Sequence, residues 1–193
     1  MDRLEPMRGL IAAVHPLPAP VWDAFANCWE PFSAPRKEIL TLAGEPERYL
    51  YFVTEGVQRV YFVDAAGREA TLVFTYAPSF GGVLDALLQR EPSRYFYETL
   101  TPSEFFRLPA DELFALMKKY PDLETLMRKG VTGALAGVLE RLAEVQSFSS
   151  EERFRSLLKR SPHILQLVPH KYLANYLGID PTNFSKFINS VRI

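Results

Sequence analysis

The sequence has few residues that bind metals or form disulfides. Its 193 residues include one cysteine, Cys28, and three histidines, His15, His163 and His170. A single cysteine excludes a disulfide framework within the chain, and it excludes zinc or iron–sulfur clusters held by several cysteines. The histidines are scattered and show no ligand spacing. We therefore expect no metal site and no required cofactor.

Long hydrophobic runs are also missing. Charged residues or prolines interrupt every apolar stretch before it reaches the ~20 residues that a membrane-spanning helix needs. The opening residues, Met-Asp-Arg-Leu-Glu-Pro, do not form the apolar core of a signal peptide. We expect a cytoplasmic protein with no membrane partner. Since 48% of the residues are hydrophobic, the chain can bury a core.

The net charge is close to zero but unevenly distributed. Residues 1–146 contain 15 basic and 20 acidic residues, whereas residues 147–193 contain seven basic and three acidic ones. An acidic body followed by a basic segment raises the question of a polyanionic partner at the C-terminal end. A short basic helical segment is also common as a solvated surface, so the charge alone does not identify a partner.

Short runs rich in tyrosine, phenylalanine and valine fill the middle of the chain. They predict strands at residues 49–53, 57–63 and 70–75, with further strand-compatible runs between residues 94 and 108. Glycine-containing turns separate the first three. Many short strands joined by tight turns favour an antiparallel β roll, of the double-stranded β-helix or jelly-roll kind, over β-α-β units.

Helical spacing of apolar residues flanks this strand region. It predicts short helices over residues 21–29 and 109–117, and a much longer helix that starts at Pro121. The expected fold class is therefore α+β. We predict a sensor domain over residues 1–146, which includes a long central helix at about 121–146, and a small all-helical module over residues 147–193.

The long helix carries a seam of apolar residues at alternating four- and three-residue steps, which is typical of coiled coils. The seam consists of Val131, Leu135, Val138, Leu142 and Val145. Three glycines on neighbouring faces each cost about 1 kcal/mol relative to alanine in a helix, so packing must offset them. Either the helix packs only on its own β domain, or the seam meets the same helix of a second subunit. We favour the homodimer.

The C-terminal residues predict two short helices joined by a tight turn. Gly178 follows the first helix, at a position where left-handed backbone is common. Asp180 is a natural N-cap for the second helix, and Pro181 suits its first position. The small side chain of Ala174 lets the two helices cross closely. Together these features indicate a helix-turn-helix.

The second of these helices presents a polar face that suits the major groove of DNA. Asparagine can pair with adenine, and lysine can reach guanine or phosphate. The candidate base-reading residues are Thr182, Asn183, Ser185, Lys186 and Asn189. Lys171 and Arg192 are candidates for phosphate contacts. An ordinary helical hairpin remains the alternative, and an outward-pointing Asp180 would disfavour phosphate.

The order of these elements resembles the Crp–Fnr family of bacterial transcription regulators. The resemblance covers nearly the whole chain from about Val21. It is carried by residues 51–56 with Val60 and Tyr61, and by residues 79–82, 92–94 and 171–179. It implies a cyclic-nucleotide-binding-like β roll, a homodimer formed through the long helix, and DNA binding tuned by a ligand.

The sequence departs from this family where nucleotide-binding members hold the ribose and the cyclic phosphate. Phe80 and Gly81 precede Gly82, where those members have a glutamate. Ser93 and Arg94 reverse an Arg-Ser pair, which in a strand would turn Arg94 to the opposite face. The resemblance therefore implies a degenerate pocket at these five residues. We expect it to bind another small-molecule effector, or none, in place of a cyclic nucleotide.

The sequence thus favours a non-enzymatic, homodimeric DNA-binding regulator. Because the chain ends at Ile193, just after the second helix, we expect a module without the wing hairpin usual in the family. The alternative is a sensor or scaffold whose β roll binds a ligand or a protein and which does not bind DNA. An enzyme of the cupin type would need clustered metal ligands, but residues 35–110 contain no histidine.

Overall fold

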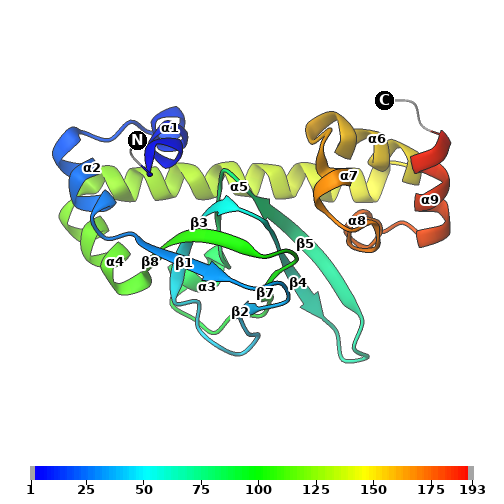
Figure 1. Cartoon of the computed structure of the whole chain (residues 1–193), viewed down its shortest axis with the longest axis horizontal. Coiled ribbons are helices and arrows are strands. Elements are labelled where there is room, and N and C mark those ends of the chain that lie inside the picture. The colour runs from blue at the N-terminus through cyan, green and yellow to red at the C-terminus, as the bar shows by residue number, and fades with distance from the viewer. Residues whose placement is uncertain (1–2, 191–193) are drawn as a thin grey trace. The chain divides into compact units, whose positions relative to one another are not determined.

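The computed structural model describes residues 3–190 (Figure 1). Backbone contacts group the chain into two compact units, one of Met1–Val60 with Phe74–Ala134 and the other of Tyr61–Val73 with Leu135–Ile193. The predicted domain boundary after residue 146 stays a prediction. No helix in the described part is long and apolar enough to cross a membrane.

Four helices belong wholly to the first unit. They are α1 (Glu5–Val14), α2 (Ala19–Ala26), α3 (Leu84–Gln89) and α4 (Ala110–Lys119). The sequence predicted α4 and placed α2 two to three residues too far along the chain, whereas α1 and α3 were not predicted. Helix α1 is stabilised by two side chains, Met7 and Ile11, which its amphipathic spacing buries. The fifth helix, α5 (Pro121–Ser147), starts in the first unit and ends in the second.

The strands form two four-stranded sheets that do not close on each other. The first has the order β1-β8-β3-β6 and the second the order β2-β7-β4-β5. The strands are β1 (Glu30–Ala34), β2 (Ile39–Thr41), β3 (Tyr49–Glu55), β4 (Val57–Val63), β5 (Glu69–Tyr76), β6 (Ser79–Gly81), β7 (Phe96–Thr99) and β8 (Ser103–Pro109). Strand β1 pairs with β8, β2 with β7, and β3 with both β6 and β8, and each of these pairs is antiparallel. The predicted antiparallel β roll is therefore confirmed, although β1, β2 and β6 were not predicted.

Side chains alternate between the two faces of β3, as the pleat requires. Leu50 and Phe52 pack with the helices, in a core that also contains residues of α1, α2, α4 and α5. Tyr51 and Val53 point to the other face and pack inside the roll with Tyr97 of β7. One strand therefore belongs to both the helical core and the roll interior.

The second unit contains α6 (Ser150–Arg160), α7 (Ile164–Leu167), α8 (His170–Leu177) and α9 (Pro181–Ser190). Ser149 caps α6. Its backbone N–H donates to Oε2 of Glu152 at 2.8 Å, and its Oγ accepts from the N–H of Glu152 at 3.3 Å. This reciprocal pair is a capping box, which fixes the first turn of α6. The short helix α7 was not predicted.

Candidate functional site

The predicted helix pair near the C-terminus is present as α8 and α9, joined by residues 178–180. Gly178 has φ of 61°, in the left-handed region that glycine accepts without strain. Asp180 caps α9, because its Oδ1 accepts hydrogen bonds from the N–H groups of Thr182 at 2.9 Å and Asn183 at 3.3 Å. The Asp180 carboxylate is therefore engaged with the positive end of α9.

A small apolar core holds this helix pair on α6. The ring of Phe154 on α6 lies edge-on to that of Phe184 on α9, with centroids 5.3 Å apart. The ring of Phe187, also on α9, packs against the Phe154 ring, with centroids 5.8 Å apart. Ala174 is buried between its neighbours, as the sequence predicted for the point of closest approach, and Ile179 of the turn is buried too.

All five candidate base-reading residues of α9 are exposed, namely Thr182, Asn183, Ser185, Lys186 and Asn189. The amide of Asn189 donates to the carbonyl of Ser185, one turn back, at 3.0 Å. Lys171 is exposed at the start of α8, with Nζ 4.6 Å from the ring centroid of Tyr172. The remaining candidate, Arg192, lies outside the described residues. The polar face of α9 is thus exposed along the described part of the helix.

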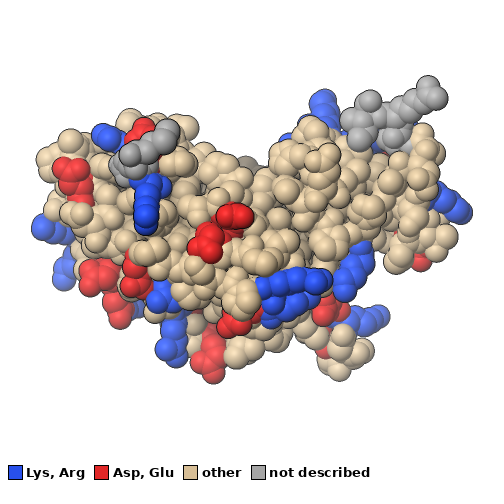
Figure 2. All heavy atoms as spheres, in the orientation of Figure 1, with Lys and Arg blue, Asp and Glu red and all other residues tan. Residues whose placement is uncertain are grey.

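The charge around this face is modest. In the view of Figure 2, basic side chains lie at the margins of the region of α6 to α9, and most of the surface there is neither basic nor acidic.

An ion pair between the exposed Arg160 and the buried Glu144 carboxylate ties α6 to the C-terminal part of α5. Both terminal nitrogens of Arg160 donate to the Glu144 carboxylate, at 2.8 and 2.9 Å, and Ser156 Oγ donates to it at 2.6 Å. Burial lowers the pKa of Arg160, but its hydrogen bonds to Glu144 outweigh burial and raise that pKa overall. The guanidinium of Arg141 lies 3.4 Å from the ring centroid of Tyr176 on α8. These contacts fix where the helix pair sits on α5.

A further contact in this unit was not predicted from the sequence. The side chain of Asn175 on α8 bonds to the backbone of β5, donating to the Glu69 carbonyl at 2.8 Å and accepting from the Thr71 N–H at 2.6 Å. Nothing in the local sequence around Asn175 points to a strand far away in the chain.

The candidate residues of the nucleotide-like pocket are split between faces and loops. Phe80 points to the helical core, where its ring packs against Phe52 at 5.3 Å and Trp29 at 6.1 Å. Gly81 faces the roll interior, and a Cβ there would collide with the Tyr97 hydroxyl. That hydroxyl bonds to Thr75 Oγ1 at 3.0 Å, and burial raises the pKa of Tyr97. Aromatic side chains thus occupy the space beside Gly81.

Gly82 lies where a glutamate would be poorly accommodated. Its φ is 108°, and a Cβ would lie 3.3 Å from the Tyr49 carbonyl and 3.4 Å from Oε2 of Glu47. The buried Glu47 carboxylate already accepts from Thr41 Oγ1 at 2.7 Å and from the Val83 N–H at 2.9 Å. Burial raises the pKa of Glu47. Sequence reasoning missed this buried carboxylate beside Gly82.

Ser93 and Arg94 lie in the loop that follows α3. The buried Ser93 Oγ donates to the Tyr95 carbonyl at 2.7 Å and accepts from the Tyr95 N–H at 3.0 Å, so it is used within its own loop. Arg94 is exposed in a bend before β7. Because Arg94 is not in a strand, the expected reversal of its face does not apply. The direction of the Arg94 side chain is therefore set by the conformation of this loop.

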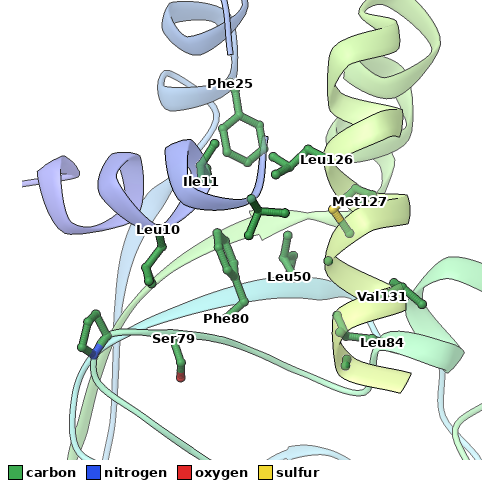
Figure 3. Close-up of a pocket in the computed structure, with 14 residues that line it drawn as sticks. Leu10, Ile11, Phe25, Leu50, Ser79, Phe80, Leu84, Leu126, Met127 and Val131 are labelled. Atoms are coloured by element: carbon green, nitrogen blue, oxygen red, sulfur yellow. The ribbon is translucent and has the colours of Figure 1, made fainter. Parts of the chain in front are cut away.

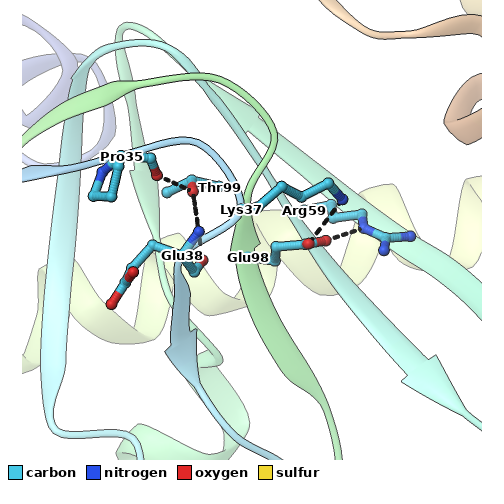
Figure 4. A network of polar contacts seen from close by, with 6 residues as sticks. All are labelled: Pro35, Lys37, Glu38, Arg59, Glu98 and Thr99. Atoms are coloured by element: carbon cyan, nitrogen blue, oxygen red, sulfur yellow. Dashed lines mark hydrogen bonds and ion pairs between the residues drawn. The ribbon is translucent and has the colours of Figure 1, made fainter.

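The second sheet contains a buried cation that the sequence reasoning did not single out (Figure 4). Arg59 is 2% exposed and donates from Nε to Oε2 of Glu98 at 2.8 Å. Lys37 donates to Oε1 of the same carboxylate at 2.8 Å. Burial alone would raise the pKa of Glu98, but the hydrogen bonds from Lys37 and Arg59 lower it overall. Thr99 Oγ1 donates to the Pro35 carbonyl at 2.7 Å and pins the neighbouring loop.

The predicted seam of α5 is largely uncovered within the chain. Leu135, Val138 and Leu142 are 55%, 53% and 50% exposed. Val131, the first residue of the seam, is half-buried. Such a row of large exposed apolar side chains is unusual on a monomer. It is typical of a surface that contacts a partner.

Comparison with known proteins identifies a matching domain family and similar proteins. Residues 31–120 match the family described as the cyclic nucleotide-binding domain. A global nitrogen regulator of Synechocystis sp. is 27% identical over 169 residues, covering 81% of this chain and 75% of that protein.

Solved structures share the fold at lower sequence identity. FixK2 from Bradyrhizobium japonicum superposes with a TM-score of 0.76 at 18% identity, covering 83% of each chain. CLP, a c-di-GMP-responsive global regulator of Xanthomonas campestris, has a TM-score of 0.66 at 15% identity, covering 89% of this chain and 90% of that one. Residues 31–120 therefore resemble a cyclic nucleotide-binding domain, and the chain shares the fold of FixK2 and CLP.

Proposed function

We propose that this protein is a non-enzymatic transcription regulator that binds double-stranded DNA with α9. The observation that carries the proposal is the exposed polar face of α9 on a helix pair that is firmly anchored. Gly178 and Asp180 define the turn, and Phe154 of α6 packs against Phe184 on the buried side of α9. A recognition helix needs this combination of a rigid mount and free polar side chains.

The relatives support the same class of function. The chain is similar to proteins named global nitrogen regulators, and it shares its fold with further global regulators. A protein that acts on the chromosome works in the cytoplasm of a bacterium, which is the localisation we propose.

We further propose that the active form is a homodimer joined along α5. The exposed side chains of Leu135, Val138 and Leu142 follow coiled-coil spacing. A second copy of the same helix would cover them with matching side chains. Two copies would also present two α9 helices to successive major grooves, which compensates for a small contact area per subunit.

We also propose that the β roll responds to an effector other than a cyclic nucleotide, or to none. Gly82 supplies no carboxylate for a ribose hydroxyl, and its positive φ disfavours a side chain. The Tyr97 side chain lies against Gly81, and Ser93 bonds within its own loop. These contacts oppose the binding of a sugar phosphate at this place.

Selection of genomic DNA fragments by the purified protein tests the proposal. We expect enrichment of a sequence with two half-sites and an affinity that falls steeply as salt concentration rises, because lysine and arginine side chains displace counterions from phosphates. Lys186→Ala should weaken this binding, whereas Lys118→Ala on α4 serves as a control with an exposed lysine far from α9 in the chain. Retention without sequence preference or salt dependence would favour the sensor or scaffold alternative.

A further inference from the structure

The first unit contains a cavity of about 350 Å³ outside the β roll. It lies between α1, β6 and the N-terminal part of α5, and its walls include Leu10, Ile11, Phe80, Leu126, Met127 and Val131 (Figure 3). Phe80 points toward Ile11 and the α5 side chains in this view. The cavity is therefore on the helical side of the first sheet, opposite to the roll interior that Gly81 faces.

The lining of the cavity is almost entirely hydrocarbon. Of the 14 residues that form it, Ser79 alone has a polar side chain, and in Figure 3 its hydroxyl points away from Leu10 and Phe80. The cavity is open on one side, and its apolar walls suit the hydrocarbon part of a ligand. The volume lies within the range of about 300–1,000 Å³ that is typical of small-molecule sites. The ligand portion inside the cavity must therefore be uncharged and apolar.

A cation lies beside two of the lining residues. Val14 and Gly130 line the cavity, and their chain neighbours His15 and Lys129 contact each other, with Lys129 Nζ 3.4 Å from His15 Nδ1. His15 Nε2 lies 3.2 Å from Asp122 Oδ1. If Nε2 carries the imidazole proton, Nδ1 accepts from Lys129, and the exposed ammonium keeps further donors. The contact joins the end of α1 to α5, one position along the chain from the cavity lining on each side.

We propose that this cavity binds an aliphatic carboxylate, with the hydrocarbon chain among Ile11, Phe80 and Leu126 and the carboxylate at Lys129. Apolar walls account for the chain, and the ammonium at the edge accounts for an acidic head group. The binding claim stands without DNA binding. A regulatory role for the ligand rests on the proposed function, because Val131 of the cavity wall also belongs to the α5 seam.

Isothermal titration of the full chain with octanoate, decanoate and dodecanoate, below their micelle concentrations, tests the site. We expect the affinity to rise about fourfold for each added methylene until the cavity is filled. Decanol, which has the same chain without the charge, should bind more weakly than decanoate. Lys129→Gln should remove that difference, while the affinity for decanol stays the same.

Matched glycine variants separate filling of the cavity from general effects on helices. Gly130→Leu places a side chain at the cavity wall, and Gly9→Leu places one on the outer side of α1, where the space around the glycine is also open. Both changes favour helix formation. We expect at least a tenfold loss of decanoate affinity in Gly130→Leu and no loss in Gly9→Leu. Ala134→Leu, also at the wall, should reproduce the loss.

Several results would overturn the site. These are an absence of decanoate binding, an affinity independent of chain length, or equal affinities for the two glycine variants. If decanoate does not bind but Gly130→Leu turns a dimer into a monomer, the cavity receives side chains of a second copy and the carboxylate proposal is wrong. Decanoate binding with no DNA binding would support the site and overturn only the proposed function.

Discussion

The side-chain amide of Asn175 pairs with the backbone around Thr71 as a neighbouring strand would. Its Oδ1 accepts from the Thr71 N–H at 2.6 Å, and its Nδ2 donates to the Glu69 carbonyl at 2.8 Å. Strand β5 lies at the edge of the second sheet, where backbone groups are open to solvent or to other partners. A single side chain of α8 therefore protects part of this edge.

Asn175→Ala should loosen the protected edge. A net hydrogen-bond contribution of about 0.5–1.5 kcal/mol corresponds to amide exchange at Thr71 that is roughly two- to tenfold faster. Hydrogen exchange followed by NMR measures this rate. Asn183→Ala, on the exposed face of α9, should leave the Thr71 amide unchanged. An unaltered Thr71 rate in Asn175→Ala would mean that this bond does not protect the strand in solution.

Val138→Asp should produce monomers. Val138 is 53% exposed at the middle of the α5 seam, and burying a carboxylate in an apolar dimer interface carries a large desolvation cost. Light scattering at several concentrations gives the mass. Ala136→Asp is the control, because two residues turn an α-helix by about 200° and place the charge away from the seam. A dimer that persists in Val138→Asp would remove the seam from the interface.

Lys186→Ala and Asn183→Ala should have different effects on DNA binding. Loss of a phosphate-contacting lysine weakens binding to all sequences and reduces the slope of log affinity against log salt concentration by about one. Loss of a base-reading asparagine costs about 1–3 kcal/mol of binding free energy at one base position. Binding assays on a set of operator variants distinguish the two patterns. Equal, sequence-independent losses in both variants would show that Asn183 does not read a base.

Asp180→Ala should destabilise the helix pair by about 1 kcal/mol, because two N–H groups at the start of α9 lose their acceptor. Asp180→Asn should restore most of the stability, since the amide oxygen can accept the same bonds. Thermal or denaturant unfolding measures the difference. If the alanine and asparagine variants were equally destabilised, the capping role of Asp180 would be disproved.

Glu98→Gln should change how stability depends on pH. The pKa of Glu98 is lowered in the folded chain from its ordinary value of 4.5, so the ionised carboxylate contributes stability above that pH. This contribution is lost as the pH falls through the folded-state pKa. We expect Glu98→Gln to be less stable than the wild type at pH 7, with a gap that narrows below pH ~4.5. A gap that stays constant from pH 7 to 3 would contradict the linkage.

Several features followed from the sequence because neighbouring residues encode them. Gly178, Asp180 and Pro181 define a helix end and a helix start within four positions, and the structure shows both. The hairpin between β4 and β5 was predicted for the same reason, because a glycine-containing turn separates two strand-like runs. The spacing along α5 predicted a helix with one apolar seam.

Other features depended on contacts between distant parts of the chain. Arg59 and Glu98 are 39 positions apart, and Asn175 and Thr71 are 104 apart, so no local pattern could pair them. Helix α3 was missed because its six residues are too few to show a helical period. The sequence by itself determined the longer strands, the long helix α5, the helix pair α8 and α9, and the polar face of α9. Tertiary structure alone decided which buried charges meet, how the roll is filled and where a cavity remains, because packing joins residues that the chain keeps apart.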